Sequence, residues 1–453
     1  MNDQKNILLI MTDEHCANAL SCTGNPNLKT PFLDKLANEG ILFSNTYTTQ
    51  PLCVPSRTAL HTGCWPHQTK VMVNAQKAVP DDAPMFPMLG SLLRNQGYRC
   101  GHIGKMHIAY RDKNNQRHIS LNKDDIEIHG FEFSDECPDV MIPSKAEAFF
   151  EENDDRPFFL NASFLNPHDC MSLAKDKDCK EKIIGSIPSN PDELPELPEN
   201  FDIPNHEPSV IREHYDRYSV PFMGGSYTPY PTRNWDELRW RQYLWGYYRL
   251  VELVDWQIGE LLINLKKSGK YDSTLIMLTA DHGDGAGHHH WYQKQILYEE
   301  TIRVPFIISD PSNDRKGIVD QSNLISLTDI PPTILDYAGV KRLPHMVGQS
   351  LRPLLRSGEW NSHKYVVSET LLATGTDVTG WAGRMLRTPD YKYVVYNHGD
   401  PREQLTDMIN DPGEMVNLAV DENYKSILDH HRQLLQEWCE STDDDFLKEV
   451  GRL

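Results

Sequence analysis

Four short stretches of the chain are almost continuously apolar, which is typical of strands buried on both faces of a sheet. They are Asn6–Met11, Tyr98–Ile103, Phe158–Phe164 and Ser273–Ala280. Each of them is followed within four residues by an acidic residue or a histidine, as Asn6–Met11 is followed by Thr12-Asp13-Glu14-His15. Ligands of open α/β sheets bind outside the carboxyl ends of the strands. The pattern therefore predicts a mostly parallel sheet with polar chemistry at one edge.

Segments with helical spacing alternate with these strands. Thr30–Gly40 places proline at the first helical position and glycine at the end, and residues 235–267 carry a long helical pattern with Tyr243, Tyr247 and Leu250 among its apolar positions. Further helices are expected over 85–95 and 328–338. Residues 111–155 are polar and irregular and predict loops, and the proline-rich stretch 186–231 predicts an extended surface loop near the substrate entrance.

The pattern changes after residue 357. Short strands are expected at 365–368, 381–386 and 391–396, followed by an amphipathic helix over 423–438. We therefore predict an α/β protein with two parts. Residues 1–356 form a large mixed, mostly parallel sheet sandwiched by helices, and residues 357–453 form a smaller C-terminal antiparallel sheet plus helix subdomain.

Composition excludes some partners. The 453 residues carry a net charge of −20, which argues against a general nucleic-acid binder because phosphate backbones need a basic footprint. The apolar runs are too short to span a bilayer, and the chain opens without a basic, then apolar, leader. These features are consistent with a cytoplasmic protein and also with a periplasmic or secreted protein whose leader was removed. The nine cysteines predict mostly reduced thiols, although Cys170 and Cys179 could pair.

The stretch Pro51–Gly63 carries the strongest chemical signal. A polar strand over residues 43–49 is expected to enter a tight turn and then a short helix, with Ser56 as N-cap and Gly63 as C-terminal stop. A nucleophile at Cys53 would face the positive end of that helix, with Arg57 one turn further on. An oxyanion there would meet backbone N–H groups and a guanidinium together.

Cys53, Pro55 and Arg57, with the continuation Thr58–Gly63, resemble the signature of the formylglycine-dependent (type I) sulfatases of the alkaline phosphatase superfamily. In that family an enzyme, a formylglycine-generating enzyme or a maturase, oxidises the cysteine to an aldehyde. A thiolate phosphatase is a rival interpretation. Those enzymes typically place five residues between cysteine and arginine, whereas three intervene here.

The resemblance also implies a metal site. Asp13 and Glu14 are similar to the paired acids after the first strand of sulfatases, and Asp281 and His282 to the second pair of ligands. The family usually has Asp or Gln at the second position, so Glu14 is a departure. An oxygen-rich set with one imidazole suits Ca2+ most simply, with manganese or magnesium as alternatives. A zinc site at residues 288–290 is disfavoured, since three consecutive histidines cannot easily face one ion.

Four more side chains complete the implied machinery. Alternation places Lys105 and His107 on the same side of an extended segment, and Gly104–His107 resembles the Gly-Lys-x-His motif of sulfatases. His168 follows Asn166-Pro167 and resembles the histidine that assists leaving-group departure. Lys294 resembles the lysine that touches the sulfate and the leaving oxygen.

The resemblance implies hydrolysis of a sulfate ester with release of inorganic sulfate. The hydrated aldehyde made from Cys53 attacks sulfur, Arg57 and Lys105 orient that hydrate, and His107 takes a proton so that the aldehyde reforms. The alternatives are a phosphodiesterase or phosphonate monoester hydrolase on the same fold, and a noncatalytic binder of sulfated glycans. We favour a sulfated saccharide as substrate, whose carboxylate or hydroxyls His290, His102 and Arg384 could recognise.

Overall fold

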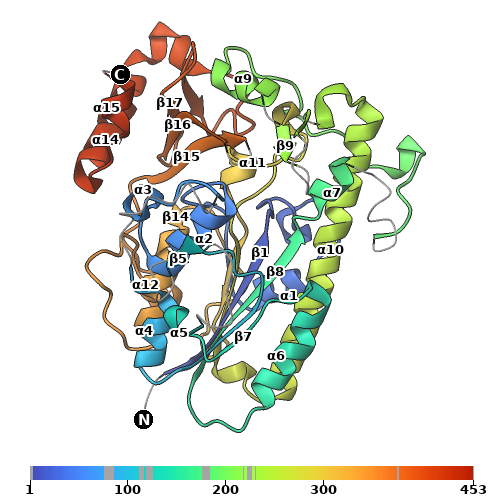
Figure 1. Ribbon diagram of the computed structural model, residues 1–453, viewed down its shortest axis with the longest axis vertical. Coiled ribbons are helices and arrows are strands. Elements are labelled where there is room, and N and C mark those ends of the chain that lie inside the picture. The colour runs from blue at the N-terminus through green and yellow to red at the C-terminus, as the bar shows by residue number, and fades with distance from the viewer. Residues whose placement is uncertain are drawn as a thin grey trace.

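The computed structural model describes residues 4–75, 86–111, 117–118, 126–175, 184–217, 219–221, 227–229, 231–374 and 377–451. Its centre is an eight-stranded sheet with the order β13-β2-β12-β11-β1-β8-β4-β7 (Figure 1). Strand β12 runs antiparallel to both neighbours, and the other pairings in the sheet are parallel. The predicted mixed, mostly parallel sheet is confirmed. Its strands are β1 (Asn6–Asp13), β2 (Ile41–Phe43), β4 (Arg99–Gly104), β7 (Phe133–Asp135), β8 (Phe158–Pro167), β11 (Thr274–Ala280), β12 (Phe306–Ser309) and β13 (Ile318–Asp320).

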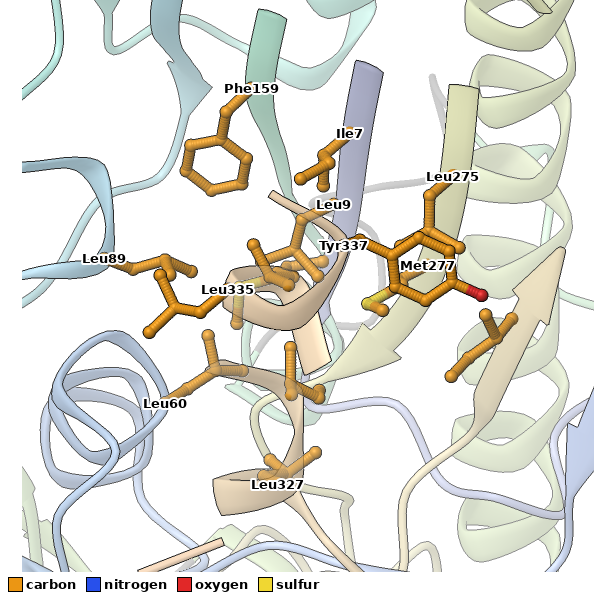
Figure 2. Packing of buried hydrophobic residues seen from close by; sticks show 14 of the residues in the cluster. Ile7, Leu9, Leu60, Leu89, Phe159, Leu275, Met277, Leu327, Leu335 and Tyr337 are labelled. Carbon is orange, nitrogen blue, oxygen red and sulfur yellow. The ribbon is translucent and has the colours of Figure 1, made fainter. Parts of the chain in front are cut away.

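Strand β1 is buried on both faces, and its side chains alternate between two hydrophobic layers. Ile7 and Leu9 pack on one face, and Leu8 and Ile10 on the other. Figure 2 shows the first layer, in which Leu60 and Leu335 lie near β1. The helices over this face are α2 (Cys53–Thr62), α4 (Leu89–Asn95) and α12 (Ile330–Tyr337), and those over the other are α1 (Pro31–Asn38), α6 (Ile142–Glu151) and α10 (Glu237–Lys267).

The C-terminal part has its own sheet. Four antiparallel strands follow one another in the order β15-β16-β17-β18 and lie at the upper end of the molecule in Figure 1. Helix α14 (Lys425–Thr442) packs on this sheet through Leu428, Leu435 and Trp438. This confirms the predicted antiparallel sheet plus helix, while the division at residue 356 stays a prediction. The strands are β15 (Val366–Thr374), β16 (Asp377–Arg387), β17 (Tyr391–Tyr396) and β18 (Glu403–Asp407), of which the sequence did not indicate β18.

Three expectations from the sequence need correction. Residues 142–151, expected as loop, form α6, because Ile142, Ala146 and Phe149 lie on one buried helix face. The polar strand expected over residues 43–49 is broken into β2 and β3 (Thr46–Tyr47). The proline-rich stretch contains the short helix α9 (Ser209–Arg217), which buries Val210 and Ile211.

The remaining helices and strands are short. Among the described residues, no helix has the length and apolar character needed to cross a membrane. Cys170 is a free, buried thiol, and Cys179 lies outside the described residues. The short elements are α3 (Pro66–Thr69), α5 (Ile126–His129), α7 (Cys170–Lys175), α11 (Glu299–Ile302), α13 (Arg352–Ser357), α15 (Phe446–Val450), β5 (Tyr110–Arg111), β6 (Arg117–His118), β9 (Ser219–Pro221), β10 (Tyr227–Pro229) and β14 (Ile325–Ser326).

Candidate active site

Four neighbouring strands end at the same edge of the central sheet, and each delivers candidate residues there. Asp13 is the last residue of β1, Asp281 follows β11, Lys105 follows β4 and His168 follows β8. Strands β4, β8, β1 and β11 are adjacent and parallel, so their carboxyl ends meet. The sheet topology therefore brings together side chains that are up to 268 positions apart in the sequence.

Helix α2 presents Cys53 to this edge. The helix begins at Cys53 and ends before Gly63, whose φ of 72° is left-handed. The predicted N-cap at Ser56 is wrong, because the Ser56 hydroxyl donates to the Asp281 carbonyl at 2.7 Å instead. The N–H of Val54 is satisfied by Asn74 Oδ1 at 2.9 Å. Cys53 is thus the first helical residue, at the positive end of the helix dipole.

The Cys53 sulfur lies among positively charged and metal-binding groups. Its Sγ is 3.3 Å from His282 Nε2, 3.3 Å from Lys294 Nζ and 3.9 Å from Asp13 Oδ1. Burial alone would raise the pKa of the thiol, but Lys105 and Lys294 hold that pKa well below its usual range. His107 forms a further hydrogen bond to the same sulfur. This microenvironment is that of a reactive cysteine, not of an inert core thiol.

Arg57 ties the two acid-bearing strands together. Its Nε donates to Asp281 at 2.7 Å, and its η-nitrogens donate to Asp13 at 2.9 Å and to Ser163 Oγ at 2.8 Å. Lys105 Nζ also lies 2.6 Å from Asp13. Burial would raise the pKa of Asp13, but Lys105 and Arg57 hold it well below its usual range. The carboxylates of Asp13 and Asp281 are therefore held in one orientation, and Asp13 stays ionised.

The acids and one imidazole fit a hard divalent cation. Ligand atoms of Asp13, Cys53, Asp281 and His282 all lie within 4.8 Å of one another. His282 Nδ1 donates to the Gly283 carbonyl at 2.9 Å, which leaves Nε2 facing the cluster. An oxygen-rich set with one nitrogen is the donor chemistry of such ions.

The carboxyl group of Glu14 also fits a bound cation. Its Oε2 accepts from Lys294 at 3.1 Å, while its buried Oε1 has no hydrogen-bond partner among the described residues. Burial raises the pKa of Glu14 to about 8, with Asp284 adding to the rise. An orphaned carboxylate oxygen at this place is what a bound cation would satisfy.

His168 borders the cluster on its accessible side. Its Nε2 is 3.6 Å from Glu14 Oε2 and 3.9 Å from Asp13 Oδ1, and its side chain remains 23% exposed. Burial, and then Lys294, lower the pKa of His168 to about 4. Asp139 fixes the turn before His168 by accepting from the N–H groups of Leu165 and Asn166 at 2.7 and 2.8 Å.

Lys105 and His107 both reach the cluster, but alternation is not the reason. His107 has a left-handed φ of 46°, so the segment is not a regular strand. Asp284 stands in the same turn as Asp281, and no motif in the sequence indicated its role. The Asp284 carboxylate accepts from Tyr243 Oη at 3.0 Å and from the Gln293 N–H at 3.0 Å. It thereby fixes the residue that precedes Lys294.

Two predicted substrate-binding residues are corrected. His102 is fully buried, and its Nε2 donates to the Gly104 carbonyl while its Nδ1 accepts from Asn161. Arg384 is buried in a two-bond ion pair with Asp444 at 2.7 and 2.9 Å. Neither group is available to a saccharide, so the expected role is wrong for both.

The side chains of the three consecutive histidines, residues 288–290, contact different partners. His288 Nδ1 lies 3.1 Å from Glu300, the ring of His289 stacks on Tyr298, and the ring of His290 packs on Phe201 with ring centroids 3.9 Å apart. The three rings therefore do not gather around one ion. The substrate role predicted for His290 stays a prediction.

The fold, with a candidate nucleophile and a candidate metal-binding acid cluster at one edge of the sheet, is that of a hydrolase of the alkaline phosphatase superfamily. Residues 5–340 match the sulfatase family, and residues 287–441 match the C-terminal region of N-sulphoglucosamine sulphohydrolase. The chain belongs to the sulfatase family and is a sulfuric ester hydrolase. Members of this family use a divalent metal and a formylglycine made from the signature cysteine.

The chain is similar to several named sulfatases along its length. It is 33% identical to the Delta 4,5-hexuronate-2-O-sulfatase of Bacteroides thetaiotaomicron, covering 98% of this chain and 90% of that one. It is 27% identical to the N-acetylglucosamine-6-O-sulfatase of the same organism, covering 95% and 86%. A solved 2-O GAG sulfatase superimposes with a TM-score of 0.80 at 30% identity, covering 98% of this chain and 94% of that chain.

Proposed function

We propose that this protein hydrolyses a sulfate ester on a sulfated saccharide, through a formylglycine made from Cys53 and with Ca2+ as its metal. The supporting observation is the convergence on Cys53 of His282, Lys294 and Asp13, each within 4 Å of its sulfur. The saccharide class is supported by two relatives that are named for sulfate groups on a hexuronate and on N-acetylglucosamine.

The metal would be held by Asp13, Glu14, Asp281 and His282. When bound, it supplies positive charge to the nonbridging oxygens of the ester and acidifies a hydroxyl at position 53. The carboxylates of Asp13 and Asp281 are already oriented by Arg57. Preorganised ligands of this kind lose little free energy to reorganisation during the reaction.

Position 53 supplies the nucleophile. An aldehyde hydrate there carries two hydroxyls, one to attack sulfur and one to expel sulfate afterwards. His107 hydrogen-bonds to the side chain at position 53 and would take the proton of the second hydroxyl. Arg57 and Lys105 orient the hydrate. The maturation of Cys53 requires a formylglycine-generating or maturase partner.

The leaving alcohol needs positive charge or a proton as the ester bond breaks. Lys294 Nζ lies between Glu14 and position 53, at 3.1 and 3.3 Å, where it can contact the sulfate and the ester oxygen together. His168 lies at the exposed side of the cluster, where the alcohol departs. We assign to these two residues the stabilisation of the leaving oxygen.

A comparison of substrates tests this function. The purified, matured enzyme is assayed with a hexuronate 2-O-sulfate disaccharide, a glucosamine 6-O-sulfate, 4-nitrophenyl sulfate and matched phosphate diesters and phosphonate monoesters. We expect kcat/KM to be highest on a sulfated saccharide. Higher kcat/KM on the phosphorus esters would favour the phosphonate hydrolase alternative, and tight binding without turnover would favour a noncatalytic glycan binder.

A further inference from the structure

Lys294 stands between two residues with unusual backbone conformations. Gln293 has a φ of 70° and Gln295 a φ of 79°, both in the left-handed region that side-chain-bearing residues rarely adopt. Such a conformation persists only where surrounding contacts hold it. On the Gln293 side, that contact is the bond from its N–H to Asp284.

Gln295 is held by three hydrogen bonds to two other segments. Its N–H donates to the Pro51 carbonyl at 3.0 Å, two residues before Cys53. Its carbonyl accepts from Thr370 Oγ1 at 2.5 Å, and its side-chain Oε1 accepts from the Ala373 N–H at 2.8 Å. Gln295 is 5% exposed, so these bonds are made in a water-poor environment and are costly to lose.

Thr370 and Ala373 belong to β15, the edge strand of the C-terminal sheet. The pairing of β15 with β16 shifts register between Leu371 and Ala373, where one residue of β15, Leu372, stands opposite three residues of β16. Leu372 is fully buried and packs in the same cluster as Ile296 and Leu297. Directly after this irregularity, the Ala373 N–H is directed at Gln295 Oε1.

The same strand also holds the loop before the nucleophile. The Glu369 N–H donates to the Thr49 carbonyl at 2.7 Å, and the Ser368 hydroxyl donates to the Thr48 carbonyl. Strand β15 therefore contacts both the segment that carries Lys294 and the segment that leads into Cys53.

We propose that Gln295 and strand β15 position Lys294 against the side chain at position 53, so that the C-terminal subdomain helps to set the catalytic geometry. Gln295 and Thr370 are positioning residues in this scheme. The proposal rests on the role assigned to Lys294 under the proposed function, but the placement of Lys294 can be measured without any turnover.

The first experiment measures that placement. Crystal structures are compared for the wild type, Gln295→Met and Thr370→Val. The first variant keeps the length of the side chain but lacks its acceptor, and the second removes only the hydroxyl donor. Thr370→Ser, which keeps the hydroxyl, is the matched control. We expect Lys294 Nζ to move away from Glu14 Oε2, 3.1 Å distant in the wild type, by about 1 Å or more in both variants and not in Thr370→Ser.

The second experiment measures turnover in a double-mutant cycle. Gln295→Met and Thr370→Val should each lower kcat about ten- to hundredfold with little change in KM, because a misplaced Lys294 acts on the transition state. The loss should grow as the leaving alcohol becomes less acidic. In a Lys294→Met background the same changes should cost less than about threefold.

Two results would overturn the proposal. One is an unmoved Lys294 Nζ in both variants, and the other is an equal loss of kcat with and without Lys294. Failure of the proposed function is a separate outcome, since a wild type without activity on any sulfate ester leaves the crystallographic comparison fully informative.

Discussion

Two buried arginines, one in each part of the molecule, form networks that look alike and differ in one respect. Arg57 binds Asp13 and Asp281 at the edge of the central sheet, and Arg384 binds Asp444 with Glu369 3.6 Å away in the C-terminal part. Each arginine side chain is at most 5% exposed. Residue types alone would assign both networks the same task.

The difference lies in whether each buried carboxylate oxygen has a partner. Around Arg384 the second acid, Glu369, accepts from His67 Nδ1 at 2.8 Å and from the His67 N–H at 3.1 Å, so the network is complete. Around Arg57, the buried acids are Asp13, Glu14, Asp281 and Asp284, and one oxygen of Glu14 has no hydrogen-bond partner among the described residues. A complete network holds parts of the fold together, whereas an acid-rich, incomplete one fits a metal cation.

The largest expected effect is on the nucleophile beside Arg57. Cys53→Ala removes the only position at which the aldehyde can form in this scheme, so kcat should fall on the order of 10⁴-fold or more. Folding should be preserved, as judged by an unchanged thermal unfolding profile. Cys64→Ala, which removes another buried thiol just beyond α2, is the control and should keep turnover. Wild-type-like turnover of Cys53→Ala would contradict the mechanism.

The second-largest expected effect is a loss of metal binding when an acid of the Arg57 network is replaced. Asp281→Asn should lower activity and Ca2+ affinity by more than about 100-fold, because it removes a ligand and a partner of Arg57. Isothermal titration of chelator-treated protein with Ca2+ measures this. In the wild type, Ca2+ at 100 times its Kd should stabilise the fold by about 2.7 kcal/mol. An Asp281→Asn protein that is stabilised equally by Ca2+ would show that the ion binds elsewhere.

Removal of the arginine in the C-terminal network should lower the stability of the fold and leave metal binding unchanged. Arg384→Met leaves Asp444 buried without its partner, which should cost about 3–5 kcal/mol of unfolding free energy. Chemical denaturation measures this cost, and kcat per folded molecule at low temperature should stay within a fewfold of wild type. A loss of Ca2+ affinity in Arg384→Met would break the distinction between the two networks.

The smallest effect is a pH dependence of the Arg384 network. Burial disfavours the charged form of His67, but Glu369 raises its pKa above the ordinary value of about 6.5. The protonated contact therefore contributes stability that is fully present below pH 6.5 and is lost as pH rises through the folded pKa. We expect His67→Phe to be less stable than wild type by about 1–2 kcal/mol at pH 5.5 and by less at pH 9. Equal differences at both pH values would show that His67 acts by packing alone.

The sequence predicted the regular parts well and the polar details less well. The buried strands and the long helix α10 follow directly from apolar runs and helical spacing, which are local properties. Ser56 could not be placed from the sequence, because its hydroxyl donates to Asp281, 225 positions away, instead of capping its own helix. His102 and Arg384 were misread for a similar reason, since a polar residue type does not reveal that buried partners already engage it.

The contacts that position Lys294 could not be predicted from the sequence either. Nothing in the residues around it indicates that Gln295 is left-handed or that strand β15 reaches it from the C-terminal part. Cys53 and Arg57 were instead found through their resemblance to a family signature, and Asp13 and Lys105 through motifs that follow buried strands, whose carboxyl ends the topology brings together.

The central claim is that Cys53 becomes the nucleophile of a sulfatase, and the mass of the peptide that contains it tests this most directly. The protein is made in its native host, digested with trypsin and compared with the thiol form. The account predicts a loss of about 18 Da at Cys53, the covalent change from –CH2SH to an aldehyde. An unmodified thiol, in a host that modifies other such motifs, would contradict it.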